Sequence, residues 1–401
     1  MKIGDSINDT SNAIKPIRLK SLDIFRGFGV ILVIISHGSH YWCNDVYSIP
    51  FYIFNSLIPL GAPLFMLLIG ISMIFMVDTM KINGKSDNEI RNLIIKRGLF
   101  LIGFGYFYNF IAEALIFLIA PYYIYPPNSA LYIIYANSSF WDWLTLFGIF
   151  HILGLCLLVS YFLYKTPIKI RIVAAINVLI ITIIITYLPL FFGGIPFHTF
   201  QPDWHYVPTA HPITIILDIL FYGQYPIFPW IFYAIVGTIV GETLLEHMKK
   251  NEPQMFINKY WKKLTILLTS GLICLIFIFI PGFFPETTLY VLFITAALIL
   301  LYMLVFRYIE INHKESKKLD YILGMLGRFS LSIYFLTGLL MVDLFLIIGV
   351  LIQIPLLGTM PFWLVVPLDV LFILLFILLT NAWAKNDFKY SLNWFERKIT
   401  R

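Results

Sequence analysis

The residues of this chain that could do chemistry stand closest together in one apolar stretch near the N-terminus. Residues 22–42 carry Asp23 and Arg26 near their start, and His37 and His40 toward their end, in otherwise hydrophobic sequence. An ionisable side chain inside such a segment is costly, so it usually marks a functional site or a structural pair. A neutral imidazole can take up a proton, and an arginine can hold a phosphate through two N–H groups. These residue types therefore indicate acid–base catalysis and anion binding as the functions to consider.

The spacing places these side chains at different depths of a bilayer. Eleven residues separate Arg26 from His37, which is roughly 16 Å along a helix. With Arg26 at the inner interface, His37 lies at or slightly past the midplane of an apolar core about 30 Å thick. His40 is one turn further out, on nearly the same face.

Structural explanations of the same residues stay open. Asp23 and Arg26 are three positions apart, so they can form a local ion pair that fixes the helix end, with or without a further role. His37 can make an interhelical hydrogen bond without chemistry. His40, nearer water, can be an interfacial polar residue.

Another histidine lies deep in a second apolar segment. His151 stands between Gly148 and Gly154, and glycines allow neighbouring helices to approach closely. It can bind a substrate or be a buried structural group. Asp142, flanked by tryptophans, fits an interfacial aromatic belt. The other ionisable groups in or beside apolar segments are Glu113, Asp218, Asp343 and Asp369.

Residues 193–225 mix polar and aromatic side chains outside the apolar spans. The segment contains His198, Asp203, Trp204, His205 and His211. The histidine spacings match no zinc motif, so we expect no metal there. The mixture is typical of the rim of a site for a polar substrate.

Two prolines break the apolar segment that follows. Pro226 and Pro229 precede Trp230. A broken backbone at membrane depth is tolerated only where protein or a wet cavity satisfies it. We expect a cavity there, near Trp230.

Composition fixes the class of protein. The chain is 60% hydrophobic and 12% charged, with a mean hydropathy of +0.85, whereas about a quarter of a soluble domain is charged. With about twenty apolar residues per crossing, the sequence predicts an all-α, polytopic integral membrane protein of about ten transmembrane helices. The expected helices cover residues 22–42, 56–77, 98–120, 140–164, 168–192, 226–247, 263–281, 286–307, 328–352 and 361–384.

The distribution of basic residues predicts how these helices are oriented in the membrane. All 28 Lys and Arg residues fall on one side of the predicted transmembrane topology, and basic residues are retained on the cytoplasmic side. Both termini are then cytoplasmic, as segments 1–20 and 385–401 of a single domain, 1–401. The net charge of +6 follows from this segregation, so we expect the lipid bilayer of the cell membrane as the partner and no nucleic acid.

Five short motifs, in order, resemble a known family. They are Leu22 to His37, Pro63 to Ser72 (PLFMLLIGIS), Phe147 to Gly154 (FGIFHILG), Pro226 to Gly241 (PIFPWIFYAIVGTIVG) and Leu326 to Tyr334 (LGRFSLSIY). Together they resemble the polytopic transmembrane acyltransferases, including the heparan-alpha-glucosaminide N-acetyltransferase family and the wider acyltransferase-3 group.

The resemblance implies transfer of an acyl group, in the first place acetyl, from cytosolic acyl-CoA to an amine or hydroxyl of an outer acceptor such as a sugar or glycolipid. His37 matches the catalytic histidine of the acyltransferase-3 pattern, and His40 is the alternative base. The mammalian enzyme uses a histidine further along, where this chain has Ser48, and relatives carry histidines where Phe329 and Thr337 stand.

The remaining roles follow from the same resemblance. Arg26 and Arg328, near the inner ends of their helices, are expected to hold the phosphates of acetyl-CoA or another acyl-CoA, with Asp23 beside them. The acceptor site is expected to include His151, Asp203, Trp204, His205 and Trp230. A homodimer is possible. The competing interpretation is a proton-coupled transporter, which the intramembrane carboxylates and proline-broken helices would also suit.

Overall fold

The computed structural model of the protein describes most of the helical part of the chain. The described residues are 17–44, 60–114, 146–191, 216, 218–222, 225–278, 286–313, 317–352, 356 and 358–400. Within them all regular elements are helical, and the extended pairing is one isolated bridge between Cys43 and Met360. The fold is all-α, as the sequence predicts.

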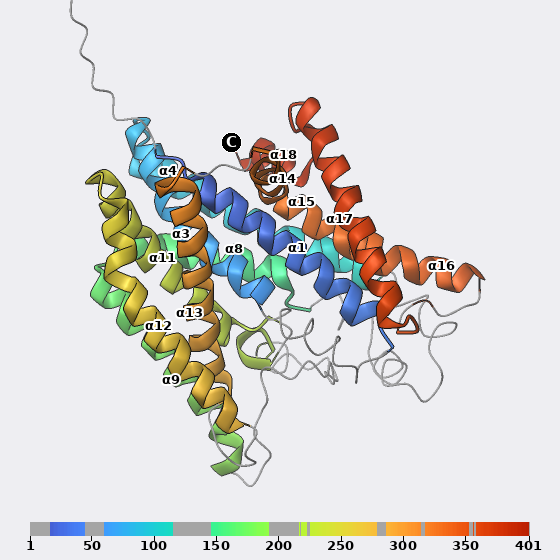
Figure 1. The fold of residues 1–401 in the computed structure, drawn as a ribbon, viewed down its shortest axis with the longest axis horizontal. Coiled ribbons are helices and arrows are strands. Elements are labelled where there is room, and N and C mark those ends of the chain that lie inside the picture. The colour runs from blue at the N-terminus through green and yellow to red at the C-terminus, as the bar shows by residue number, and fades with distance from the viewer. Residues whose placement is uncertain are drawn as a thin grey trace, which may run out of the picture.

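In the part of the chain that the structure describes, ten longer helices form the body of the protein (Figure 1). They are α1 (Lys20–Trp42), α3 (Gly61–Ile82), α4 (Asp87–Tyr108), α8 (Ile149–Tyr164), α9 (Ile168–Phe191), α11 (Ile227–Lys249), α12 (Pro253–Ile278), α13 (Glu286–Phe306), α14 (Lys317–Arg328) and α17 (Phe362–Lys385).

Shorter elements complete the described part. They are α15 (Ser330–Thr337), α16 (Leu344–Ile352), α18 (Leu392–Thr400) and the π-helical segments η2 (Asn109–Ala114), η4 (Asp218–Tyr222), η5 (Arg307–Ile311) and η6 (Gly338–Asp343).

Two helices begin earlier than hydropathy indicates. The expected helix 98–120 begins at Asp87 as α4, because the Ser86 side chain accepts a hydrogen bond from the Glu89 amide and Glu89 accepts one from the Ser86 amide. This capping box starts a helix in polar sequence. The expected helix 263–281 likewise begins at Pro253 as α12. Capping and proline at a first turn, which hydropathy does not register, set both starts.

The region around Arg328 differs most from the prediction. The expected helix 328–352 is found as one continuous helical stretch from Ser330, made of α15, η6 and α16 and long enough to span a membrane, but α14 ends at Arg328 directly before it. Residues 317–327, expected to be a loop, form most of α14. This helix is amphipathic and too short to span, so a search for twenty apolar residues passes over it.

The break in front of Trp230 is confirmed. Pro226 caps α11, and Phe228 has non-helical angles within its first turn (φ −100°, ψ 121°). The helices 22–42, 168–192, 286–307 and 361–384 are found within a few residues of their expected bounds as α1, α9, α13 and α17, whereas 56–77 is displaced to Gly61–Ile82 and 140–164 is described from Ile149.

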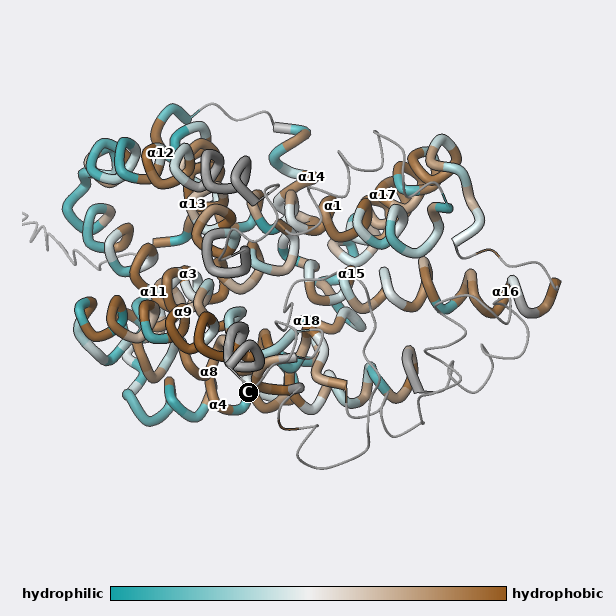
Figure 2. The backbone as a smooth tube through the Cα atoms, turned by 90° about the horizontal axis from the view of Figure 1, so that it is seen from below, coloured by the Kyte–Doolittle hydropathy of each residue, from teal (hydrophilic) through white to brown (hydrophobic). Residues whose placement is uncertain are grey.

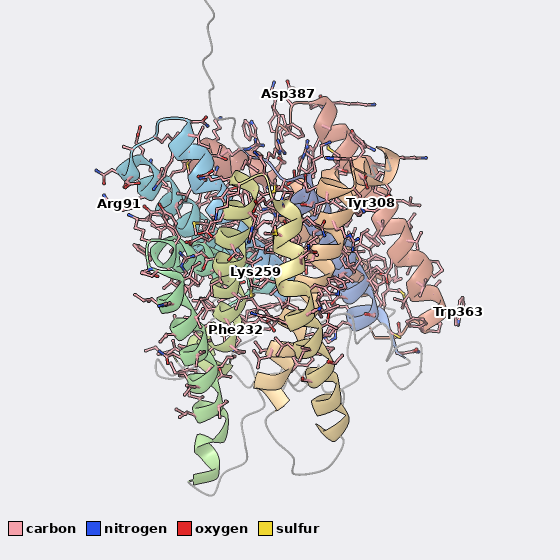
Figure 3. All side chains as sticks on the ribbon, turned by 60° about the vertical axis from the view of Figure 1, so that its left-hand side comes forward. Arg91, Phe232, Lys259, Tyr308, Trp363 and Asp387 are labelled. Carbon is pink, nitrogen blue, oxygen red and sulfur yellow. The ribbon has the colours of Figure 1, made fainter. Side chains whose placement is uncertain are left out.

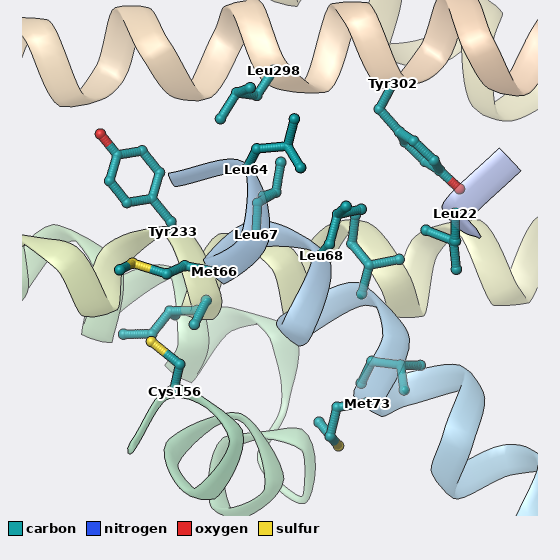
Figure 4. Close-up of a cluster of buried hydrophobic side chains, with 14 of the residues drawn as sticks. Leu22, Leu64, Met66, Leu67, Leu68, Met73, Cys156, Tyr233, Leu298 and Tyr302 are labelled. Atoms are coloured by element: carbon teal, nitrogen blue, oxygen red, sulfur yellow. The ribbon is translucent and has the colours of Figure 1, made fainter. Parts of the chain in front are cut away.

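Close helix packing forms the main core. A Cβ atom on Gly70 of α3 would collide with the Ala234 carbonyl oxygen of α11, and one on Gly237 would collide with the Leu67 carbonyl oxygen. The two backbones therefore touch where both residues are glycine. Figure 4 shows the neighbouring layer, in which leucines of α3 meet Leu298 and Tyr302 of α13, all buried.

Seven of the described helices are long and apolar enough to cross a membrane. Figure 2 shows long brown, hydrophobic runs along α9, α11 and α16, with teal, hydrophilic stretches mostly where helices end. α9 and α17 leave isoleucines and leucines exposed, such as Ile184 (55%) and Leu378 (68%). Such outward apolar faces suit lipid contact. The protein is therefore a multi-pass membrane protein, while the count of about ten spans and the single domain stay predictions.

Candidate active site

Five arginines converge on one pocket at one end of the helices. The pocket has a volume of about 320 Å³, and five arginines face two carboxylates in it. Its walls come from α1, α4, α14 and α18 and from the turn before α18. Its polar lining is Arg18, Asp23, Arg26, Arg97, Arg328, Asn393, Glu396 and Arg397, with Phe329 and Phe388 beside it. The surplus of guanidinium groups favours the binding of an anion, so the pocket is a candidate anion-binding site.

Asp23 gathers three of these arginines. Its Oδ1 lies 3.3 Å from Nη1 of Arg26, and its Oδ2 lies 3.1 Å from Nη2 of Arg18 and 3.5 Å from Nε of Arg328. The local Asp23–Arg26 pair expected from their spacing is thus present. It is also part of a larger site, so the structural and the functional interpretation of these residues are compatible.

Helix packing brings Arg26 and Arg328 together across three hundred residues of sequence. On α1, a Cβ atom at Gly27 would collide with the Leu323 carbonyl oxygen of α14. On α14, one at Gly327 would collide with the Asp23 carbonyl oxygen. The two helices cross in backbone contact there, and each arginine directly adjoins one of these glycines. Gly27 and Gly327 therefore place both guanidinium groups around Asp23.

Arg26 also reaches a neighbouring helix. Its Nη2 donates a hydrogen bond to the Ser72 hydroxyl of α3, and its side chain is 26% exposed. Arg328 keeps 45% of its side chain exposed. Arg26 is therefore the deeper and more restrained of the two, and Arg328 has more freedom to meet a ligand.

His37 is held in a form that can accept a proton. Its Nδ1 lies 2.8 Å from the Val33 carbonyl oxygen. Because a carbonyl oxygen only accepts hydrogen bonds, Nδ1 carries the hydrogen in this contact. In the neutral ring Nε2 then has the free lone pair. This is the arrangement in which a backbone partner orients a general base.

Arg26, which lines the pocket, and His37 lie on one face of α1. Both residues lie on one uninterrupted helix, Lys20–Trp42. Eleven residues are close to three turns at 3.6 residues per turn, so Arg26 and His37 project to the same side about 16 Å apart.

Aromatic rings surround the histidines. The Tyr41 ring lies between them, with its centroid 5.6 Å from that of His37 and 5.1 Å from that of His40. The Tyr334 ring of α15 stands edge-on to His37 at 6.0 Å. The predicted pair of histidines is thus part of one aromatic cluster at the C-terminal end of α1.

Trp230 is linked to this cluster through two tyrosines. The Tyr334 and Tyr225 hydroxyls share a hydrogen bond, and the Tyr225 and Trp230 rings are 5.3 Å apart. The start of α11, where the prolines lie, is therefore connected to His37. Trp230 is 8% exposed, so it can support this region more readily than contact a ligand directly.

His151 makes its described hydrogen bond within its own helix. Its Nδ1 accepts a hydrogen bond of 3.1 Å from the Gly148 amide at the start of α8, and the ring is fully buried against Gly105 of α4. Tyr106 and Phe147 pack on it, with ring centroids 4.3 and 5.2 Å away. These contacts favour the structural interpretation of His151, as the cap of a helix.

A buried carboxylate also lies near the histidines. Asp369 of α17 is 4% exposed and packs against the backbone of Gly38, the residue after His37. Its Oδ1 has no hydrogen-bond partner in the described part of the protein. Of the intramembrane carboxylates that the sequence singles out, Asp369 is thus placed beside the candidate base.

Asp203, Trp204 and His205 lie outside the described residues, so their expected role stays a prediction. Within the described ranges, no three His, Cys, Asp or Glu side chains gather to hold a metal ion. The loop histidines His198 and His211 are outside those ranges as well.

Several pocket residues carry no signal as isolated sequence positions. Arg97 and Arg397 look like ordinary cytoplasmic charges, and they meet because α18 folds back against α4. The clue available in the sequence is the amphipathic pattern of residues 392–400, in which apolar residues stand on both sides of the charged run Glu396 to Lys398.

Comparison with known protein families shows which family the chain belongs to. Residues 18–281 match the family described as heparan-alpha-glucosaminide N-acetyltransferase, catalytic. The chain belongs to this family. No curated protein matches it.

Membership of this acetyltransferase family confirms the resemblance that the first-helix motif and its successors indicate. The protein is accordingly a membrane acetyltransferase by family. The matched residues run from the start of α1 to just beyond α12. Arg328 and the C-terminal helices, which complete the arginine pocket, lie outside the match.

Proposed function

We propose that this protein transfers an acetyl group from acetyl-CoA, or another acyl group from its acyl-CoA, to an amine or hydroxyl of an extracytoplasmic acceptor. The observation that carries the proposal is the alignment, on one face of α1, of the arginine pocket with a histidine whose Nε2 is free to accept a proton. Family membership supports the reaction class.

The pocket supports a phosphate-bearing donor. Arginine binds phosphate through two parallel N–H groups, and Arg26 and Arg328 both present guanidinium groups around Asp23. Asp23 keeps their charges together before the donor arrives. The donor's phosphates lie there in this proposal, with the acyl arm directed along α1 toward His37.

His37 is the general base of the proposed transfer. Its Nε2 accepts the proton of the acceptor's amine or hydroxyl while the acceptor attacks the thioester carbonyl. A C–N or C–O bond forms, the C–S bond breaks, and the protonated imidazole returns its proton to the departing thiolate. His40, one turn further out, is the alternative base, with His37 then orienting it.

The acceptor reaches the site from the opposite side in this proposal. The aromatic cluster of Tyr41, Tyr334 and Tyr225, supported from behind by Trp230, offers flat rings and hydroxyls, a combination suited to a polar, ring-shaped molecule. A sugar or glycolipid is therefore the proposed acceptor. The proposed location is the cell membrane, and the possible homodimer stays a prediction.

Two measurements on purified protein test the proposal. Acetyl-CoA should raise the thermal unfolding temperature, and candidate amino sugars should then cause release of free thiol. A transporter would carry solute with no thiol release, and a lipid-binding protein without chemistry would show no response to acetyl-CoA. Either result would reject the enzymatic assignment.

A further inference from the structure

The two carboxylates of the arginine pocket divide it into two halves. Asp23 holds Arg18, Arg26 and Arg328 at the α1 side, as described above. Across the pocket, Glu396 of α18 lies 3.4 Å from Nε of Arg97 on α4. Arg397, the next residue, also lines the pocket. The second half is thus built by the C-terminal helix, beyond the family match.

The C-terminal helix is anchored at this place. The Ser332 hydroxyl of α15 accepts a hydrogen bond of 2.9 Å from the Leu392 amide and donates one of 3.0 Å to Oδ1 of Asn393. In the turn before it, Asp387, Phe388 and Tyr390 have φ angles between 51° and 65°, a backbone region that non-glycine residues seldom adopt. These contacts therefore fix the position of α18 beside the pocket. Phe388, in the preceding turn, lines the pocket.

Arg97 has a donor that its partner does not satisfy. Its Nε is buried and makes no hydrogen bond in the described part of the protein, although Glu396 is within ion-pair distance. Glu396 is itself 17% exposed, and burial raises its pKa against the opposing effect of Arg97 and Arg397. A buried N–H group with an imperfect partner favours an anion with better geometry.

We propose that Arg97 and Arg397 form a second phosphate subsite of the donor pocket, in which Glu396 occupies the place of a phosphate until the donor arrives. The proposal rests on the proposed function. An acyl-CoA carries phosphates in two places, a diphosphate next to the acyl arm and a 3′-phosphate on the ribose. The diphosphate belongs to the Asp23 half, from which α1 leads to His37. The phosphate monoester then belongs to the α18 half.

The test compares acetyl-CoA with acetyl-3′-dephospho-CoA, which lacks only the monoester. Wild-type protein should bind acetyl-CoA about ten- to hundredfold more tightly, the range of a hydrogen bond to a charged group. Arg397→Gln should remove most of this preference and leave the affinity for the dephospho compound unchanged. Arg328→Gln should weaken both ligands and keep the preference.

Three further variants protect the test from a folding artefact. Arg97→Gln alone leaves Glu396 buried without a partner, so it is combined with Glu396→Gln; the double variant should also lose the preference. Glu396→Gln alone should tighten acetyl-CoA binding severalfold, because it removes the internal competitor. Lys398→Gln, on the exposed side of the same helix, should change neither affinity.

Each other outcome counts against the subsite. Equal affinity of wild-type protein for the two ligands, or an equal loss of both in Arg397→Gln, would overturn it. The phosphate could instead come from an anionic lipid headgroup. In that case, nanodiscs with anionic lipid should show lipid retained in an Arg397-dependent way that acetyl-CoA does not displace. If wild-type protein binds neither ligand, the proposed function itself fails.

Discussion

Among single residues, Asp23 has the most consequential position. Arg18, Arg26 and Arg328 would repel one another without a central carboxylate, and Asp23 contacts all three within 3.5 Å while 14% exposed. A ligand phosphate that enters this half meets cations that are already assembled. Pre-organisation of this kind lowers the free-energy cost of binding.

Replacement of Arg328 by alanine should weaken acetyl-CoA binding by about 1.5–3 kcal/mol, the contribution of a hydrogen bond to a charged group. Isothermal titration of the folded variant measures this. Arg91→Ala is the matched control, because Arg91 is an exposed arginine of α4 (Figure 3) outside the pocket lining. Unchanged affinity in Arg328→Ala would remove this residue from the donor site.

Replacement of His37 by alanine should lower the rate of transfer about 10²–10⁴-fold, the usual contribution of a positioned base, while acetyl-CoA still binds. His40→Ala should have the smaller effect if His37 is the base. Thiol release in the two variants decides between them. For wild-type protein the rate should rise with pH as the imidazole loses its proton, and near-normal turnover in His37→Ala would exclude it from the mechanism.

Among the elements, pairs of helices in backbone contact determine where side chains meet. α1 and α14 cross at Gly27 and Gly327, and α3 and α11 cross at Gly70 and Gly237. The first crossing assembles the arginine pocket and the second forms the main core. Small residues are what allow such contacts between membrane helices.

Gly237→Ala should lower the free energy of unfolding by about 1–3 kcal/mol, because the new methyl group meets the Leu67 carbonyl and the Gly70 backbone, which cannot move aside as a side chain could. Thermal unfolding in detergent measures the change. Gly103→Ala is the control: no heavy atom beyond its own helix lies within 4 Å of the added Cβ, so stability should hold or rise. Equal stability of both variants would contradict the close packing.

Docking of α18 should depend on pH through Glu396. Burial raises its pKa from the ordinary value of 4.5, and Arg97 and Arg397, the charged groups nearest to it, lower it by less. Docking therefore favours the protonated carboxyl, so its stabilising effect is complete below the ordinary value and is lost as pH rises through the raised value. Amide exchange of residues 392–400, corrected for intrinsic rates, should show this loss. Glu396→Gln should remove the dependence.

At the scale of the whole molecule, the proposed donor and acceptor sites lie toward opposite ends of α1. The pocket gathers around its first residues and the aromatic cluster around its last. Figure 3 shows the same polarity in α17, where Asp387, just beyond its end, and Trp363, at its start, lie far apart. A transfer reaction between molecules on two sides of a membrane needs such an arrangement.

The predicted orientation can be tested by labelling. A cysteine introduced into the 121–139 segment should react with an impermeant thiol reagent only from the outer side, and one at Lys398 only from the cytoplasm, because basic residues remain on the cytoplasmic side. Labelling of the 121–139 position from the cytoplasm alone would show that the predicted membrane orientation is wrong.

The sequence alone determined the class of the protein and part of its site. Hydropathy is a property of each segment by itself, so the long apolar helices and the all-α class could be predicted, as α1, α9, α13 and α17 demonstrate. The family could be predicted from the short motifs. The relation of Arg26 to His37 was equally accessible, since helical geometry alone places residues eleven positions apart on one face.

The tertiary structure decided which distant residues share the pocket. Arg97, Arg328 and Arg397 meet only because α14 packs on α1 and α18 folds back beside α4. Short amphipathic helices have no membrane-length apolar run, so hydropathy assigned α14 and α18 to loops. It also gave no sign that His151 caps its own helix, because that contact depends on a hydrogen bond to the Gly148 amide. Pairing of charges across the chain depends on backbone approach between helices, and no single segment encodes it.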